Sequence, residues 1–277
     1  MADNFDELRK VVQRMTARIE PALKNIRESW QEVEARLTPF WSYMEGIGSL
    51  LASLPLDEIS ANAASFIRAF EQLPPKVQNA ILSLAEHGWF IDVFDETFSL
   101  LFDLQKAIET KGIHEADRIL EHFYEQKADE IEKYLVKRYR HRRDILGAAF
   151  EAHRNGLYVL SVLAFFSQVD GICWDMAESN FFVKRDGQPE IAGYIQSLPR
   201  GELTDSVLSA LTSSLPISYS RSERGPEFSG LNRHMVVHGE SVDYGTRQNS
   251  LKAMSLLLYT TKALEHVESL FLAETDG

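Results

Sequence analysis

The chain has 277 residues, of which 44% are hydrophobic and 25% charged, and this balance excludes wholesale disorder. Its net charge of −12 argues against a general nucleic-acid coat protein, because such proteins are basic overall, but it leaves room for a local basic site. The single cysteine, Cys173, lies among apolar residues and has no partner for an internal disulfide. We therefore expect a buried thiol in a reducing compartment.

The chain carries no evident signal for secretion or membrane insertion. Its N-terminus is polar and acidic and lacks the apolar run of a signal peptide. The longest apolar run, 156–169, is too short to span a bilayer. We therefore expect a cytoplasmic protein with no membrane partner.

Helical periodicity dominates the chain, and no series of alternating strands is evident. From residue 4 to 37 apolar residues recur at heptad spacing, which predicts a long helix that Pro21 kinks or splits. This seam fits packing within one domain at least as well as it fits a coiled-coil dimer. The seam residues are Val12, Ile19, Leu23, Ile26, Trp30, Val33 and Leu37.

Prolines and glycines punctuate the segment that follows. They predict a bent connection over 38–58, and a helix follows over 57–72. The residues Leu-Pro-Pro at 73–75 predict a break and a domain boundary, after which helical spacing returns over 76–87 and ends at Gly88. A cluster of aromatic side chains is then expected in the core: Trp89, Phe90, Phe94 and Phe98.

Long helices are predicted in the second half of the chain. Two of them cover 114–143 and 144–180, with a break or bend near 144–147. A mixed segment follows, with turn signals at RDGQP and LPRG and a helix at 202–214. The last helix is expected to start at a cap formed by Asn249 or Ser250.

These patterns predict an all-α protein built as a helical bundle. We expect three parts: an N-terminal helical region over 1–75, a helical connector over 76–125 and a helical domain over 126–277.

The segment LNRHMVVHGESVDYGT, residues 231–246, places one arginine and two histidines within six positions, in a chain with eight histidines. Gly239 predicts the end of the helix that carries Arg233, His234 and His238. Because Arg233 and His238 lie about 140° apart around such a helix, they need not face one point within a single chain. Two copies around a two-fold axis could bring these helix ends together.

Metal-independent cleavage of RNA needs such residues. A base removes the proton of the 2′-hydroxyl, an acid protonates the leaving 5′-oxygen, and a fixed cation stabilises the phosphate. Histidine can serve as base or acid near neutral pH, and arginine holds phosphate oxygens in pairs. One catalytic histidine per chain is too few for both proton transfers, so this chemistry favours a homodimer.

The run Arg233-His234-Met235-Val236-Val237-His238 resembles the R-x4–6-H motif of the HEPN superfamily, helical nucleotide-binding proteins that include many prokaryotic ribonucleases. His234 stands where that motif commonly has Asn, Asp or His. The pair Asp170-Gly171, near the end of an apolar helix, is also similar to the family, and the resemblance covers residues 126–277.

This resemblance implies an HEPN-like C-terminal domain that acts as a metal-independent endoribonuclease and leaves 2′,3′-cyclic phosphate ends. Arg233 and His238 would be the catalytic pair, with His234 orienting them or contacting phosphate, and no cofactor would be needed. The role would be similar to that of HEPN toxins and phage-defence effectors, which an antitoxin or another regulatory protein controls. Glu240 stands where toxins silenced by nucleotidyltransferase antitoxins often have tyrosine, and Tyr244 lies too far along, so modification of a tyrosine is not expected.

Other interpretations of the same residues remain open. His234 and His238 could chelate a metal with Glu240 or Asp243, although Met235 stands where a zinc hydrolase needs glutamate, so we expect no metal. Arg233 could instead pair with a carboxylate such as Asp170 while His238 caps the helix end. The alternative function is a non-catalytic module that binds RNA, a nucleotide or a protein partner.

One dense basic run, KYLVKRYRHRR at 133–143, interleaves cations with two tyrosines. It predicts an RNA backbone contact, which Arg221 and Arg224 would extend. It fits equally well a solvated helix face paired with the acidic stretch EQKADEIE that precedes it. The predicted RNA-binding residues are Lys137, Arg138, Arg140, Arg142, Arg143, Arg221 and Arg224, and we assign structural roles to His87, His114, His122, His141, His153 and His266.

Overall fold

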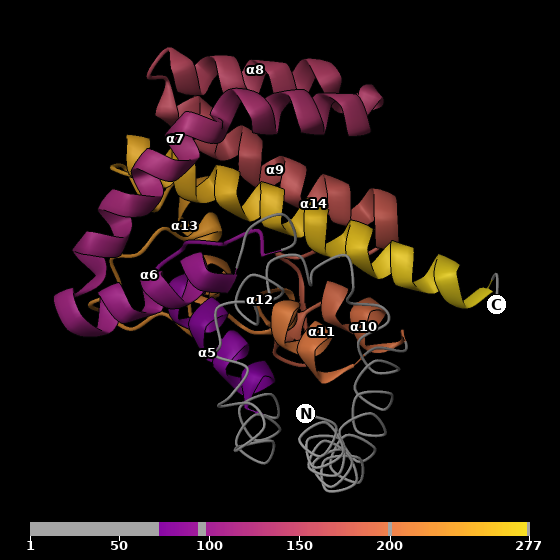
Figure 1. Ribbon diagram of the computed structural model, residues 1–277. Coiled ribbons are helices and arrows are strands. Elements are labelled where there is room, and N and C mark those ends of the chain that lie inside the picture. Colours follow the sequence, from indigo (N-terminus) through magenta and orange to yellow (C-terminus); the bar gives the residue numbers. More distant parts are fainter. Residues whose placement is uncertain (1–71, 94–97, 199–200, 276–277) are drawn as a thin grey trace, which may run out of the picture. The chain divides into compact units, whose positions relative to one another are not determined.

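A computed structural model describes residues 72–93, 98–198 and 201–275 (Figure 1). The chain divides into two compact units between Ala69 and Phe70, and all the described residues belong to the second unit. The helices predicted over 4–37 and 57–72 and the connection over 38–58 lie outside the described residues. Helices dominate this second unit, so the all-α class is confirmed for it.

The first described helix, α5 (Leu73–Ala85), starts three residues earlier than predicted. Pro74 and Pro75 stand in its first turn, where the N–H that proline lacks would have no partner within the helix. They therefore begin a helix instead of preceding one. Gly88 ends the turn that follows with a φ of +83°, and Trp89 and Phe90 are buried as predicted.

Two helices lead from this region to the bundle. Helix α6 (Phe98–Lys111) is joined to α7 (Ile113–Arg138) by Gly112, which has a φ of +83°. Helix α7 crosses the predicted boundary at 125/126 without interruption. The short helix η2 (Arg140–Arg142) follows Tyr139, so the break after α7 comes earlier than the predicted bend.

The helix predicted over 144–180 is two helices, α8 (Arg143–Arg154) and α9 (Tyr158–Ala177). Asn155 caps the end of α8, and Gly156 reverses the chain with a φ of +72°, a conformation that glycine adopts without a steric cost. The prediction of one helix was wrong because the apolar periodicity continues on both sides of this turn. The reversal lets α8 fold back onto α9, where Phe150 and Phe165 pack edge to face with ring centroids 5.0 Å apart.

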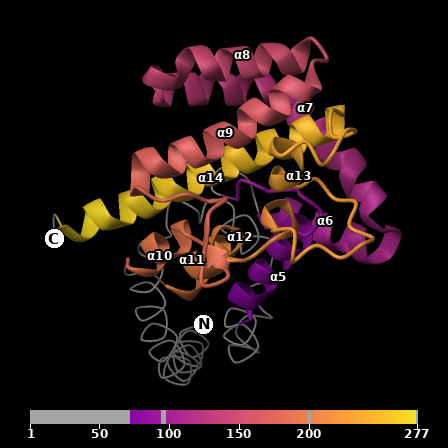
Figure 2. The same ribbon diagram turned by 180° about the vertical axis from the view of Figure 1, so that it is seen from behind.

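Helix α9 lies between α8 and α14 (Arg247–Thr275), and α9 and α14 run side by side in both views (Figures 1 and 2). Thr246 caps α14, because its Oγ1 accepts a hydrogen bond of 3.1 Å from the N–H of Asn249. The predicted caps, Asn249 and Ser250, thus lie inside the helix. Ser250 is fully buried and bonds to Ser161 of α9 at 2.7 Å.

Helix α9 has 20 residues and a mean hydropathy of 1.3, and among the described residues it is the one helix long and apolar enough to cross a membrane. It is longer than the run 156–169 because the helix continues past Asp170 to Ala177. Its contacts with α8 and α14 are those of a central helix in a bundle. Cys173 of this helix is fully buried, as predicted.

Short elements fill the chain between α9 and α14. The strands β1 (Lys184–Arg185) and β2 (Gln188–Pro189) form a hairpin whose turn, Asp186-Gly187, has positive φ at both residues. The helix predicted over 202–214 is split at Leu208 into two. The remaining elements are α10 (Ile191–Gln196), α11 (Glu202–Val207), α12 (Ser209–Thr212), η3 (Pro216–Ser218) and α13 (Arg233–Val237).

Candidate functional site

The helix that carries the motif, α13, has only five residues and depends on the side chain of Asn232. Its Oδ1 accepts a 3.0 Å hydrogen bond from the N–H of Met235, which caps the helix. Its Nδ2 donates to the carbonyls of Pro216 and Tyr219 at 2.7 and 3.0 Å. Asn232 is 1% exposed, so the start of α13 is fixed to the chain around η3.

The end of α13 confirms the prediction made from Gly239. This glycine has a φ of +71°, and His238 is the C-cap residue of the helix. The N–H groups of Glu240 and Ser241 both return to the carbonyl of Met235, at 2.8 and 3.1 Å. His238 is therefore held at the tip of a tight reversal, where it is exposed.

Arg233 points from α13 towards α9. Its Nη2 lies 3.9 Å from Oδ2 of Asp170, and its guanidinium stands over the ring of Phe182, 5.5 Å from the centroid. Oδ1 of Asp170 is occupied by the N–H groups of Phe181 and Phe182, at 2.9 and 3.0 Å. The pairing of Arg233 with Asp170, which the alternative structural interpretation names, is thus present, but at the long end of ion-pair distances and without a hydrogen bond.

The carboxyl of Asp170 is partly withdrawn from water. Burial raises its pKa, and this effect outweighs the N–H groups of Phe182 and Phe181 and the charge of Arg233, which lower it. The pairing of Arg233 with Asp170 is weak because the two groups are 3.9 Å apart and share no hydrogen bond. The guanidinium, whose side chain is 27% exposed, keeps hydrogen-bond donors for a ligand.

The two histidines of the motif lie parallel. Their ring centroids are 6.0 Å apart and their planes differ by 9°. Burial lowers the pKa of His234, and the nearby positive charges of Arg233, His238, Arg224 and Lys184 lower it further. His234 is thus a neutral imidazole among fixed cations at neutral pH, and a neutral imidazole can accept a proton.

The cations that act on His234 come from three separate segments, and we call Lys184, Arg224 and Arg233 the cation cluster. Arg224 has a side chain only 7% exposed and contacts Glu240, just after the motif, at 3.0 Å. Lys184 of β1 contacts Glu223 at 2.6 and 2.8 Å and Ser214 at 2.7 Å. The fold therefore brings three cations near the two histidines, and each of them lies beside a carboxylate, of which that of Asp170 is the most distant.

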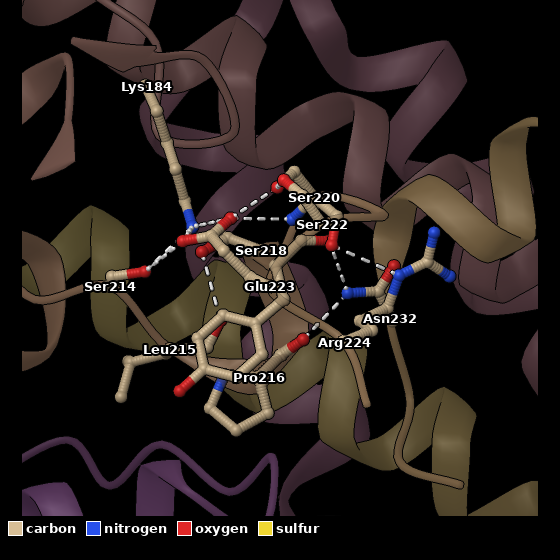
Figure 3. A network of polar contacts seen from close by, with 11 residues as sticks. Lys184, Ser214, Leu215, Pro216, Ser218, Ser220, Ser222, Glu223, Arg224 and Asn232 are labelled. Carbon is tan, nitrogen blue, oxygen red and sulfur yellow. Dashed lines mark hydrogen bonds and ion pairs between the residues drawn. The ribbon is translucent and has the colours of Figure 1, made fainter. Parts of the chain in front are cut away.

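Figure 3 shows how Glu223 holds this region together. Besides Lys184, its carboxylate accepts hydrogen bonds from the N–H and Oγ of Ser220, at 2.8 and 2.7 Å, and from Ser214 at 3.1 Å. Burial opposes ionisation of Glu223, but the hydrogen bonds from Lys184 and Ser220 outweigh it and lower its pKa to about 2. This network fixes the chain from 214 to 224, which leads to Asn232 and α13.

The basic run 133–143 divides into paired and unpaired residues. Arg138 contacts Glu265 and Glu268 of α14 at 2.6 and 3.1 Å. Its partners, like those of Arg142, lie in later helices and not in the acidic stretch that precedes the run. The predicted RNA contacts that are exposed and make no ion pair with another described residue are Lys137, Arg140, Arg143 and Arg221.

The guanidinium of Arg142 bonds to three residues of α9. It donates to both carboxylate oxygens of Asp175 at 2.7 and 2.8 Å, to Gln168 at 3.2 Å and to the carbonyl of Gly171 at 2.7 Å. A Cβ added to Gly171 would lie 2.4 Å from Nη1 of Arg142, so a larger residue here would displace the guanidinium from its present place. The neighbouring residues Asp170 and Gly171 thus each contact an arginine: Asp170 contacts Arg233, and Gly171 contacts Arg142.

This geometry gives little support to the alternative interpretation of a metal site. Among the described residues, no group of three or more His, Cys, Asp or Glu side chains could hold a metal ion. Glu240, a proposed third ligand, is turned towards Arg224, and Asp243 accepts a hydrogen bond from Ser241 at 3.0 Å.

A serine–histidine–glutamate arrangement lies elsewhere and was missed from the sequence. Nδ1 of His153 is 2.7 Å from Oγ of Ser250, and its Nε2 is 3.5 Å from Glu125. This arrangement resembles a catalytic triad in its contacts, but a substrate cannot reach it, because Ser250 is 0% exposed and His153 is 2% exposed. These residues join α7, α8 and α14, so the structural role assigned to His153 fits its surroundings.

Comparison with protein-family models, curated proteins and solved structures found no match to this chain.

Proposed function

We propose that this chain is a metal-independent endoribonuclease of the HEPN type, with a site built on Arg233 and His238. The observation that carries the proposal is the group of cations around two stacked histidines, one of them exposed, in a strongly acidic chain. An anionic ligand is the natural occupant of such a site. RNA supplies both the phosphate for the cations and a 2′-hydroxyl for a histidine base.

In the proposed reaction, a histidine removes the proton of the 2′-hydroxyl, and the 2′-oxygen attacks phosphorus. The bond from phosphorus to the 5′-oxygen breaks, and an acid protonates that oxygen. The products are a 2′,3′-cyclic phosphate and a 5′-hydroxyl. Arg233, whose pairing with Asp170 is long, is free to exchange this carboxylate for phosphate oxygens.

A second copy of the chain completes this chemistry. The base and the acid must stand on opposite sides of the phosphorus atom. His234 and His238 are stacked 6.0 Å apart on one turn of chain, so they approach a ligand from the same side. A homodimer provides a histidine for the opposite side.

The setting of this activity is proposed on the resemblance alone. We propose a cytoplasmic effector similar to HEPN toxins or phage-defence ribonucleases, controlled by an antitoxin or another regulatory protein. Arg221, Lys137, Arg140 and Arg143 are the exposed cations that would contact the RNA backbone.

One observation favours the alternative, a non-catalytic HEPN-like module. Arg233 already has an aromatic ring and a carboxylate beside it, an arrangement that can be purely structural. A module of this kind would bind RNA or a nucleotide through the same cation cluster without cleaving it.

The deciding experiment is an RNA-cleavage assay in EDTA with the full chain, Arg233→Ala, His238→Ala and His87→Ala. We expect cleavage to persist in EDTA, to leave 2′,3′-cyclic ends and to fall by about 100-fold or more in the first two variants. His87 is exposed at the end of α5, so His87→Ala controls for loss of a surface histidine. Binding without cleavage in the wild-type chain would leave the module as the answer.

A further inference from the structure

Trp174 is the largest of the exposed apolar side chains among the described residues. It stands near the end of α9 and is 55% exposed. An indole ring in water gains free energy when it stacks on another flat apolar surface. The charged groups around Trp174 decide which kind of surface fits it.

On one side, Trp174 borders the motif. Asp170 precedes it by four residues on α9, and residues four apart are neighbours on the surface of a helix. Nη2 of Arg233 lies 3.9 Å from Oδ2 of Asp170. The arginine of the proposed catalytic pair therefore approaches α9 about one helical turn before Trp174.

On the other side, Trp174 borders the short helix η2. Gly171, three residues before Trp174, accepts a 2.7 Å hydrogen bond from Arg142 at its carbonyl. Asp175, the next residue of α9, accepts two more from Arg142, at 2.7 and 2.8 Å. The same carboxylate lies 2.7 Å from Nε2 of His141, whose side chain is 63% exposed. These bonds fix η2 and its cations next to Trp174.

Exposed cations extend from this contact. Arg140 precedes His141 and Arg142 directly in the chain, and Arg143 follows them. Both Arg140 and Arg143 are exposed, and so is Lys137 near the end of α7. Trp174 therefore lies between the arginine of the motif and a group of exposed cations from the basic run.

Acidic residues also stand near Trp174. Asp170 and Asp175 each lie beside an arginine, so part of their charge is balanced. Glu178, four residues after Trp174, is exposed at the end of α9 and bounds this surface. A polyanion that passes over Trp174 thus meets cations on two sides and a carboxylate at one edge.

We propose that Trp174 stacks on one base of a single-stranded RNA, which runs from the motif across the end of α9 to the exposed cations beside η2. This inference rests on the proposed function for the class of ligand and adds the contact that holds a base. Asp170 and Trp174 are about 6 Å apart along the helix axis. The stacked base therefore belongs to a nucleotide close to the scissile phosphate.

The surroundings of Trp174 favour a single strand. Proteins that bind single-stranded nucleic acid place aromatic rings among cations, so that bases stack while phosphates contact the positive charges. In a duplex, neighbouring base pairs cover the faces of each base, and Trp174 would find no ring to stack on. Duplex RNA can still reach Arg140 and Arg143 through its phosphates.

A protein partner fits this surface less well. The centre of a protein interface is depleted of charged residues. Trp174 instead has cations or ion pairs on both sides along α9, at Asp170 and at Asp175.

The first test is binding of the full chain to an unstructured single-stranded RNA that carries 2′-O-methyl groups and cannot be cleaved. We expect Trp174→Ala to weaken binding by about tenfold or more. Trp174→Phe should keep most of the affinity because it keeps a ring, whereas Trp174→Leu should bind as weakly as Trp174→Ala. Binding of a duplex of the same sequence should be equal in all four chains.

A matched control lies on the same helix. Leu160 of α9 is also 55% exposed, but it stands about 20 Å away along the helix axis. Leu160→Ala should leave the affinity for the single strand unchanged. Thermal unfolding by circular dichroism verifies that every variant is folded.

Stacking has a spectroscopic signature that a structural role for Trp174 would lack. A base that stacks on an indole ring quenches its fluorescence. We expect the single strand to quench the tryptophan fluorescence of the wild-type chain, and we expect most of this quenching to be lost in Trp174→Phe, which still binds.

The salt dependence of binding separates the ring from the cations. Arg140→Ala should reduce the slope of log K against log salt concentration by about 0.7, because one phosphate contact is lost. Trp174→Ala should leave this slope unchanged, since stacking releases no counterions. A change of slope in Trp174→Ala would contradict the stacking role.

Several results separate this proposal from the proposed function. Single-strand binding that Trp174→Ala leaves intact, or quenching that persists in Trp174→Phe, would overturn the stacking role even if the chain cleaves RNA. A dimer that Trp174→Ala dissociates without loss of RNA binding would assign Trp174 to a protein interface instead. Binding and quenching that behave as expected, in a chain that cleaves no RNA, would support the stacking role and overturn the ribonuclease.

Discussion

Two basic segments reach α9 at adjacent residues and end in different surroundings. Arg142, from the dense run 133–143, lies over Gly171 with its donors occupied by Asp175, Gln168 and a backbone carbonyl. Arg233, from a segment with few cations, meets Asp170 at 3.9 Å with no hydrogen bond. The density of basic residues in a sequence therefore says little about which cation is available to a ligand. The number of fixed acceptors around each one decides it.

The largest expected difference is between the two arginines themselves. We expect Arg142→Ala to lower the free energy of unfolding by about 2–4 kcal/mol, because it removes charge-assisted hydrogen bonds and leaves Asp175 without its main partner. Arg233→Ala should cost less than about 1 kcal/mol, since its ion pair is long. Urea unfolding measures both, and equal losses would show that the two sites are alike after all.

The motif should depend more on its cap than on its arginine. Asn232→Ala removes the cap and two donor bonds from a buried residue, and we expect a loss of about 2–3 kcal/mol in the same assay. Asn155→Ala, at the exposed end of α8, is the control and should change little. A small loss in Asn232→Ala would mean that α13 is held in place by other contacts.

The fit of Arg142 on α9 can be tested from the other side. Gly171→Ala places a methyl group where the guanidinium lies, and we expect a loss of about 1–3 kcal/mol. Gly193→Ala in α10 meets no atom within 4 Å and should be neutral or stabilise slightly, because alanine favours a helix. Equal changes in the free energy of unfolding for Gly171→Ala and Gly193→Ala would contradict the close fit of Arg142 against Gly171.

The smallest effect concerns Glu223 and acid. Its pKa is lowered from 4.5 to about 2 in the folded chain, so its contribution to stability is fully present above pH 4.5 and is lost as the pH falls towards 2. Glu223→Gln should therefore be less stable than wild type at neutral pH, and the difference should shrink over this range. Urea unfolding at a series of pH values measures it, and a difference that stays constant with pH would contradict the role of the charged form.

The sequence predicted some features of this region because they depend on neighbouring residues alone. The helical class follows from apolar periodicity, the end of α13 from Gly239, and a turn, though not the hairpin around it, from Asp186-Gly187. The break between α8 and α9 was missed, because apolar residues keep a helical spacing both before and after Gly156. The cap of α14 was misplaced by three or four residues, because Thr246, Asn249 and Ser250 are close together and each is a residue that can cap a helix.

The candidate site likewise combines features that neighbouring residues determine with features that only the tertiary structure determines. The sequence by itself determined that Arg233, His234 and His238 share one short helix end, since local spacing decides it. Only the tertiary structure decided that Lys184 joins them, because Lys184 lies 50 residues before His234 and reaches it through β1 and the Glu223 network. It also decided that Arg142 is occupied, since its acceptors lie on α9, about 30 residues further along the chain. Periodicity describes which side of a helix is apolar, but the partner that covers that side is chosen by contacts between segments that no local pattern records.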